Sequence, residues 1–241
     1  MLFLKALAFG AMLFIVSKAN FNFVGILFFC AIAFVLYFRP SFVGSYYAKY
    51  AFAILIGVSI FGMKIITDFT IFLSPSLADI AFGGGIFLFS FIFYLILGVK
   101  EVFFIKRSRI HYVVALLLFY TLFIIFFLSD KPNFYFLNYS AVIISSFLLF
   151  KEWLSIVSVF HFPKREFIAS IAATFIVAQL LWAVALLPIG FIAAANSMLL
   201  FVLILGNFLF AHFTGGLSKI FLIRHLVLFL FLILLILRFF V

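Results

Sequence analysis

The sequence has few charged residues, and this scarcity excludes an ordinary soluble domain. Charged residues make up 9% of its 241 residues and hydrophobic residues 70%, with a mean hydropathy of +1.49. Soluble domains carry about 25% charged and about 45–50% apolar residues, so water would not support a folded globule of this composition. The chain is therefore expected to fold with lipid around it.

Cysteine is almost absent, since Cys30 is the only one in the chain. A single cysteine excludes a disulfide within the chain. Cys30 lies in an apolar run of phenylalanine and alanine, where a thiolate is disfavoured. We interpret it as a small apolar residue and not as a nucleophile.

Catalytic and cofactor motifs are missing as well. The sequence contains no His-Glu-x-x-His motif and no Gly-x-Ser-x-Gly motif, and the triplet 83–85 of glycines is not followed by the Lys-Ser or Lys-Thr of a phosphate loop. The four histidines belong to four separate segments and lack the short spacing of metal ligands. We therefore expect no catalytic residue, no metal and no cofactor.

Long apolar segments are present instead. Segments of about 17–22 residues recur along the chain, and each is long enough to cross a hydrocarbon core of about 30 Å. They are apolar on every side, which favours helices over the alternating strands of a membrane β-barrel. We predict an all-α polytopic transmembrane helix bundle that forms one integral membrane domain over residues 1–241. The expected nine spans lie at about 2–17, 21–38, 46–63, 81–99, 112–128, 134–150, 167–187, 191–211 and 220–241.

The basic residues predict how these spans are oriented. Loop 100–111 holds four basic residues and one glutamate, so the positive-inside rule assigns it to the cytoplasm. Alternation from this loop gives a cytoplasmic N-terminus, in the cell (inner) membrane if the chain is prokaryotic. The cytoplasmic set is Lys5, Arg39, Lys49, Lys100, Lys106, Arg107, Arg109, Lys164, Arg165, Lys219 and Arg224, and the outer set is Lys18, Lys64, Lys131 and Arg238.

Signal-peptide cleavage and nucleic-acid binding are two further interpretations of the sequence. The first segment also resembles a signal peptide, whose cleavage would leave eight spans. The formal charge of +10 is explained by the basic loops between spans, so nucleic acid is not an expected partner.

Lys151 and Glu152 stand side by side in an apolar run, and two placements of the sixth span compete. If residues 141–162 cross the membrane, Glu152 lies near the midplane, where an ionisable group indicates function. If the span begins after the turn 129–133, Glu152 is about 27 Å further on and has reached the cytoplasmic interface. The second placement is favoured, and it predicts an interfacial helix over 153–162.

Polar residues in the later spans predict a seam, meaning a row of polar side chains, between the sixth, seventh and eighth helices. Asn138, Ser145 and Glu152 recur every seven residues and so share one helix face. Gln179, Asn196 and Asn207 are the strongest candidates for buried polar groups in the following charge-free stretch. Hydrogen bonding between packed helices is the alternative role for both sets.

The pattern favours binding or transport of a small uncharged or amphipathic solute through the seam. The first alternative is a non-catalytic membrane subunit or scaffold that docks on partner proteins and on anionic lipid. The second alternative is a lipid-headgroup enzyme at the cytoplasmic interface that uses Glu152, His161 and His212. The expected partners are the bilayer, other membrane subunits and anionic lipids, which would contact Arg107, Arg109, Lys164 and Arg165.

Overall fold

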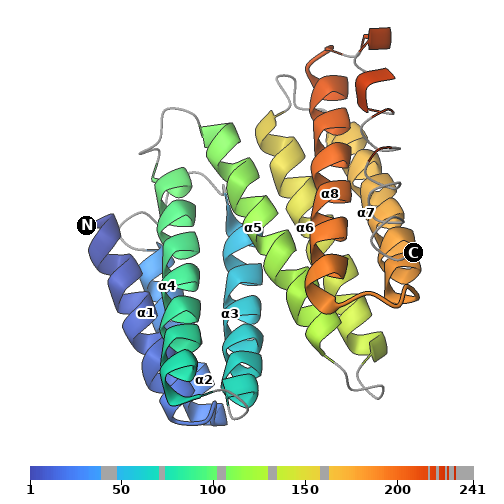
Figure 1. The fold of residues 1–241 in the computed structure, drawn as a ribbon. Helices are drawn as coiled ribbons and strands as arrows, with labels where there is room; N and C mark the ends of the chain where they lie inside the picture. Colours follow the sequence, from blue (N-terminus) through green and yellow to red (C-terminus); the bar gives the residue numbers. More distant parts are fainter. Residues whose placement is uncertain are drawn as a thin grey trace. The chain divides into compact units, whose positions relative to one another are not determined.

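The computed structural model describes residues 1–38, 48–70, 74–101, 107–129, 135–157 and 163–216, together with 218–220, 223–225, 227 and 231. Every regular element in these ranges is an α-helix, which confirms the predicted all-α class (Figure 1). The labelled helices are α1 (Leu2–Lys18), α2 (Phe23–Phe38), α3 (Lys49–Thr70), α4 (Pro75–Lys100), α5 (Arg107–Leu128), α6 (Tyr135–Val157), α7 (Pro163–Ala185) and α8 (Phe191–Phe213).

Helices α3 to α8 each contain a segment long and apolar enough to cross a membrane. Helices α1 and α2 are also apolar but have only 17 and 16 residues. A crossing takes about 20 residues, so the six longer helices support an integral, multi-pass membrane protein. The ninth predicted span, 220–241, lies mostly outside the described residues.

Several helix ends differ from the prediction. The third span was expected to end at 63, but α3 continues to Thr70, and the fourth was expected to begin at 81, but α4 begins at Pro75. Proline is compatible with the first turn of a helix, where its missing N–H has no helical partner. Helix α6 likewise continues past 150 to Val157, because lysine and glutamate are good helix formers. Residues 153–157 therefore extend α6 and do not begin a separate interfacial helix.

A tight turn joins α1 to α2. Asn20 and Phe21 both have positive φ angles, 52° and 51°, which reverse the chain within a few residues. The side chain of Asn22 then accepts a hydrogen bond from the Gly25 N–H at 2.7 Å. This is the N-cap arrangement that satisfies one of the unpaired N–H groups at a helix start.

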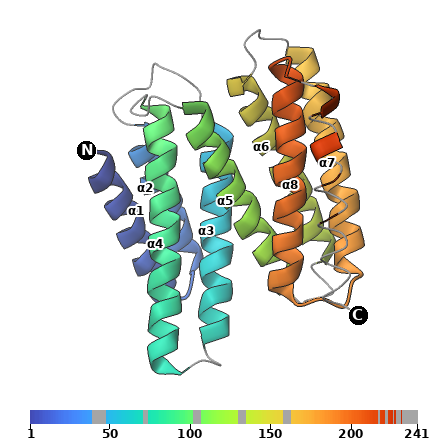
Figure 2. The same cartoon turned by 45° about the horizontal axis from the view of Figure 1, so that its top comes forward.

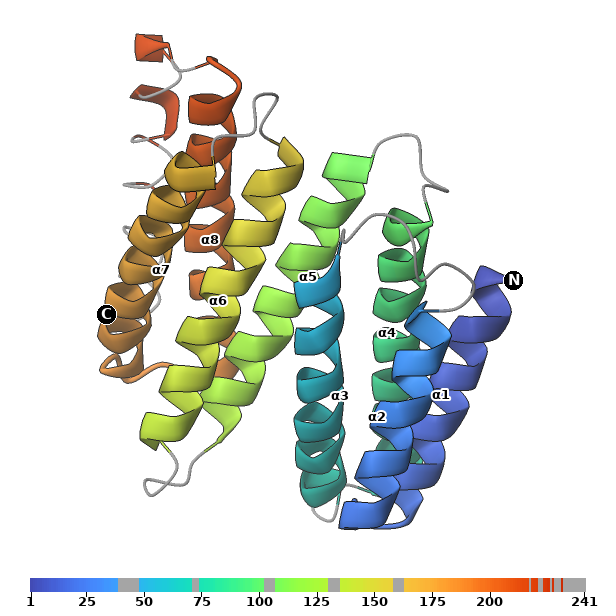
Figure 3. The same ribbon diagram turned by 180° about the vertical axis from the view of Figure 1, so that it is seen from behind.

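The chain divides into two compact units, Met1–Thr121 (unit 1) and Leu122–Val241 (unit 2), with the boundary inside α5. In unit 1, α4 packs between α1 and α3, and α2 lies beside α1 (Figure 3). In unit 2, α7 packs against both α6 and α8 (Figure 2). Each unit is described separately below.

Buried aromatic rings form the core of unit 1. Phe9 stacks on Phe93 with ring centroids 4.4 Å apart, and it also contacts Phe29 at 5.1 Å. Phe52 lies 6.0 Å from Phe93 and stacks on Tyr37 at 4.1 Å. Because these five rings come from α1, α2, α3 and α4, their contacts connect all four helices.

Small residues let the helices of unit 1 approach closely. A Cβ atom on Gly10 of α1 would overlap the hydroxyl of Ser90 on α4. A Cβ atom on Gly85 of α4 would lie 2.7 Å from Ile66 Cδ1 and 2.9 Å from Met63 Sδ, both on α3. In lipid, helices associate by van der Waals packing at such small residues.

Helices α6 and α7 form an antiparallel pair in unit 2. The hydroxyl of Tyr139 donates a hydrogen bond of 2.9 Å to the Ala178 carbonyl, and the Tyr139 ring meets Trp182 edge-on at 6.2 Å. Toward the other end, Phe147 meets Phe167 at 5.7 Å. These contacts fix the register between the two helices.

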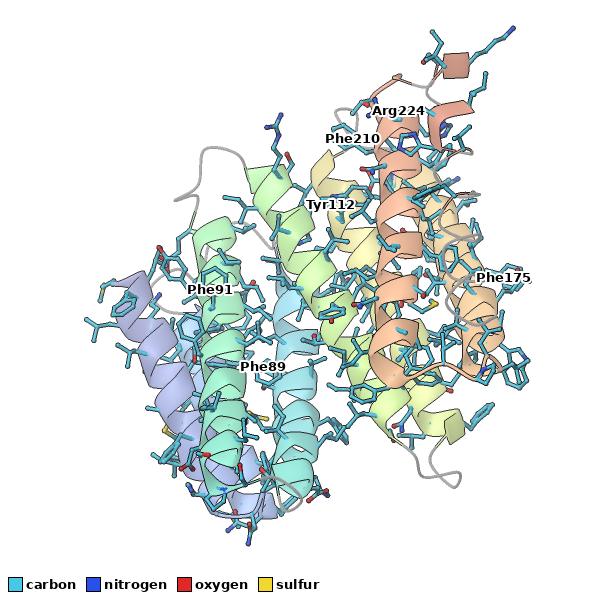
Figure 4. The ribbon with its side chains drawn as sticks, in the orientation of Figure 1. Phe89, Phe91, Tyr112, Phe175, Phe210 and Arg224 are labelled. Carbon is cyan, nitrogen blue, oxygen red and sulfur yellow. The ribbon has the colours of Figure 1, made fainter. Side chains whose placement is uncertain are left out.

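The core of unit 1 leads to a first prediction, on α4. Phe93→Ala removes a fully buried ring and is expected to lower the free energy of unfolding by on the order of 3 kcal/mol. Phe91→Ala is the matched control, because Phe91 is 44% exposed on the same helix (Figure 4) and its loss should change stability by about 0.5 kcal/mol or less. Denaturation of the purified protein in detergent measures both, and equal losses would contradict the proposed core.

Candidate functional site

Charged side chains gather at one end of unit 1. Lys5 on α1 is buried, and its Nζ lies 2.6 Å from Oε1 of Glu101, the residue that follows α4. Lys100, the last residue of α4, is 5% exposed and donates a hydrogen bond from Nζ to the backbone carbonyl of Tyr37. We call Lys5, Lys100 and Glu101 the charged clamp, since their contacts connect α1, α2 and α4.

The end of α2 explains the position of Lys100, whose side chain reaches it from α4. Tyr37 lies in the last turn of α2, where carbonyl groups have no partner within the helix and carry partial negative charge. The Lys100 ammonium satisfies one of these carbonyls, and it also lies 4.5 Å and 5.5 Å from the ring centroids of Tyr37 and Phe38. Hydrogen bonding and cation–π attraction thus both hold the charge in place.

The three polar residues predicted to share a face of α6 have different environments. The Asn138 side chain donates a 2.6 Å hydrogen bond to the hydroxyl of Ser129, just after α5, which is a packing role. Ser145 is half-buried. Glu152 is 4% exposed and stands five residues before the end of α6 at Val157, about 8 Å along the axis. Glu152 is thus enclosed by protein, and its depth in the membrane stays a prediction.

Lys151, beside Glu152, has a different environment. It is half-buried, and its Nζ lies 5.9 Å from the ring centroids of both Phe147 and Phe167. Its charge is therefore held against the aromatic contact that joins α6 to α7.

The structure does not gather the three amides in the interior of unit 2. Gln179 and Asn196 are exposed and Asn207 is half-buried, so the expectation that all three are buried is not met. Gln179 is two residues from both Val177 and Leu181, which are buried on α7. Two residues correspond to about 200° around a helix, so Gln179 faces outward. Asn196 stands in the same relation to buried Ala194 and Met198 on α8.

A buried polar stripe on α7 was missed from the sequence. Glu166, Ser170 and Thr174 follow one another at four-residue intervals, and all three are buried. The two hydroxyls donate to the carbonyls of Glu166 and Ser170 at 2.6 Å and 2.7 Å. The four-residue spacing is the signal that would have revealed this stripe. Its hydroxyls are satisfied within their own helix.

Ser146 is the buried hydroxyl that α6 contributes to unit 2. It is fully buried, and its Oγ has no hydrogen-bond partner within the described residues. Seven residues separate it from Tyr139, whose side chain contacts α7, so Ser146 lies on the same side of α6.

The predicted headgroup contacts are basic residues at the starts of helices. Lys164 and Arg165 are exposed in the first turn of α7, and Arg109 is exposed in the first turn of α5. Arg107 begins α5, but its side chain lies outside the described residues. Lys49 is exposed at the first position of α3.

The described ranges hold no cluster of side chains with the composition of a metal site. No three His, Cys, Asp or Glu side chains there gather as metal ligands. Of the three residues named for a headgroup enzyme, Glu152 is buried on α6, His212 is exposed near the end of α8, and His161 lies outside the described residues.

Comparisons with protein-family models, with curated proteins and with solved structures find no match. The functional assignment therefore depends on the residues and contacts of this chain.

The charged clamp leads to a second prediction. Glu101→Gln removes the carboxylate that neutralises buried Lys5, and we expect it to lower the free energy of unfolding by about 1–3 kcal/mol. Adding Lys5→Met should restore at least half of the loss, because the buried charge is then gone as well. Denaturation of the single and double variants in detergent measures this coupling.

Lys64→Met is the control for charge removal, because Lys64 is exposed on α3. This substitution should change the free energy of unfolding by about 0.5 kcal/mol or less. Additive losses in the Lys5 and Glu101 double variant would show that the two side chains do not stabilise each other.

Proposed function

We propose that the protein is a non-catalytic membrane subunit or scaffold that binds anionic lipid headgroups at its cytoplasmic side and docks on other membrane components. One observation carries this proposal: exposed basic side chains stand in the first turns of α3, α5 and α7. The residues are Lys49, Arg109, Lys164 and Arg165.

Helix stability does not account for these positions. The start of a helix carries unpaired N–H groups and partial positive charge, so a lysine or arginine there is electrostatically unfavourable. A phosphate is attracted both by the N–H groups and by the basic side chains. Anionic headgroups at the cytoplasmic surface supply phosphates at this depth, and each basic residue near such a surface contributes about 1 kcal/mol.

The proposed topology has nine crossings with a cytoplasmic N-terminus. The charged clamp supports it within unit 1, because the clamp joins the start of α1 to the ends of α2 and α4, as alternating crossings require. Alternation then assigns the starts of α3, α5 and α7 to the same membrane face. This face would be the cytoplasmic one.

Solute passage through the predicted seam is the weaker proposal on this geometry. Gln179 and Asn196 face outward, and the hydroxyls of Ser170 and Thr174 are bonded to their own helix. Such groups do not require a solute. The interior of unit 2 is therefore better explained by helix packing, in which polar contacts contribute about 0.6 kcal/mol each on average.

A third prediction tests the lipid contacts. Replacing both Lys164 and Arg165 by glutamine should weaken binding of phosphatidylglycerol by about 30-fold, because two favourable charges of about 1 kcal/mol each are lost. Native mass spectrometry of the purified protein, titrated with phosphatidylglycerol or phosphatidylcholine, measures the change. Phosphatidylcholine binding should be unaltered.

Lys18→Gln with Lys64→Gln is the matched control, since it removes the same charge from exposed residues assigned to the opposite face. Equal losses in the two double variants would rule out a specific headgroup surface.

In a Cys30→Ala background, Lys164→Cys and Lys18→Cys should react with an impermeant thiol reagent from opposite sides of the membrane. Labelling from the same side would contradict the topology.

A fourth prediction tests whether the interior of unit 2 is closed by helix packing or open to a solute. In the same background, Ser170→Cys should be protected from a small water-soluble thiol reagent, as should Val177→Cys on the same buried face of α7. Fast labelling at Ser170→Cys alone would indicate a water-filled path and restore the solute hypothesis.

A further inference from the structure

Two outward-facing amides lie at one level of unit 2. Gln179 is six residues before the end of α7 at Ala185, and Asn196 is five residues after the start of α8 at Phe191. At 1.5 Å per residue these positions are about 9 Å and about 8 Å from the connected ends of the two helices. Both helices are long and apolar enough to cross a membrane, and if they do so both amides lie inside the hydrocarbon region.

An amide exposed at this depth is not stably accommodated by lipid alone. Acyl chains offer no hydrogen-bond partner, and an unsatisfied amide in an apolar medium is disfavoured by several kcal/mol. Neither amide has a hydrogen-bond partner within the described part of the chain. A protein group at the same depth would stabilise either amide by supplying this hydrogen bond.

A second copy of the same chain meets this requirement without any further assumption. A carboxamide is donor and acceptor at once, so two of them form a reciprocal pair. Copies inserted in one direction hold each residue at the same depth, and a two-fold axis along the membrane normal brings a residue opposite its own equivalent. An unrelated partner would need its own hydrogen-bonding group at this depth.

The surroundings of the two amides favour α8 as the contact. Asn196 lies among Ile192, Ala193 and Leu200, which are exposed, and Ala193 is small enough to let two backbones approach. Gln179 lies near exposed Ala183 but between two larger exposed side chains, Phe175 and Trp182, at 61% and 54%. The Phe175 ring points away from α7 (Figure 4) and would hold a partner helix at a distance.

We propose that two copies of the protein associate in the membrane through the outward face of α8, with Asn196 hydrogen-bonded to Asn196 of the second copy. This inference rests on the proposed role as a membrane subunit and specifies one partner as a second copy. It does not depend on headgroup binding, so the phosphatidylglycerol titration and the association measurement fail independently.

Association is measured on the full chain in liposomes by energy transfer between donor- and acceptor-labelled copies, over a series of lipid dilutions. Asn196→Leu should weaken association by about 3- to 20-fold, the range expected for loss of an interhelical amide hydrogen bond. Asn196→Gln should retain association because the amide is kept. Gln179→Leu is the matched control at the same depth and should change association by less than about twofold if α8 forms the contact.

Cysteine crosslinking tests the same contact without changing the amide. In a Cys30→Ala background, Ala193→Cys should form a dimer in oxidised membranes much faster than Leu137→Cys, an exposed position on α6. Leu137 is two residues after the start of α6, as Ala193 is two residues after the start of α8, so both lie about 3 Å from a helix end. Equal crosslinking at the two positions, a wild-type monomer at every dilution, or unchanged association in Asn196→Leu would each overturn the proposal.

Discussion

The backbone must satisfy its own hydrogen bonds in hydrocarbon, and the rest of this structure follows from that requirement. Within the spans, helices meet it for every residue except those at their ends. The charged side chains of the clamp lie at such helix ends. Lys100 supplies a donor to a terminal carbonyl of α2, and Lys5 and Glu101 neutralise each other beside it. The clamp is thus a consequence of ending helices within protein.

The helices of the two units pack through different kinds of side chains. Unit 1 joins its helices through stacked rings around Phe93 and through close approaches at Gly10 and Gly85. Unit 2 has instead a Tyr139 hydrogen bond between α6 and α7 and a buried row of hydroxyls on α7. Without a hydrophobic force between helices in lipid, shape and a few hydrogen bonds decide which faces meet.

Exposed polar groups are the basis of the two proposals. Basic residues stand at the starts of α3, α5 and α7, where the helix dipole disfavours a positive charge. Asn196 is exposed on α8, a helix long and apolar enough to cross a membrane. The proposed contacts with anionic lipid and with a second copy start from these two features.

The sequence by itself determined the helical class and the multi-pass membrane character, because apolar length is enough to identify a membrane-spanning helix. It also indicated which residues are polar. It did not determine where those residues face, as Gln179 and Asn196 show, because spans that are apolar all round carry no pattern that distinguishes a neighbour from lipid. Only the tertiary structure brought Lys5 to Glu101, 96 residues away. Helix phase and pairing depend on side-chain fit between segments, which local sequence does not specify.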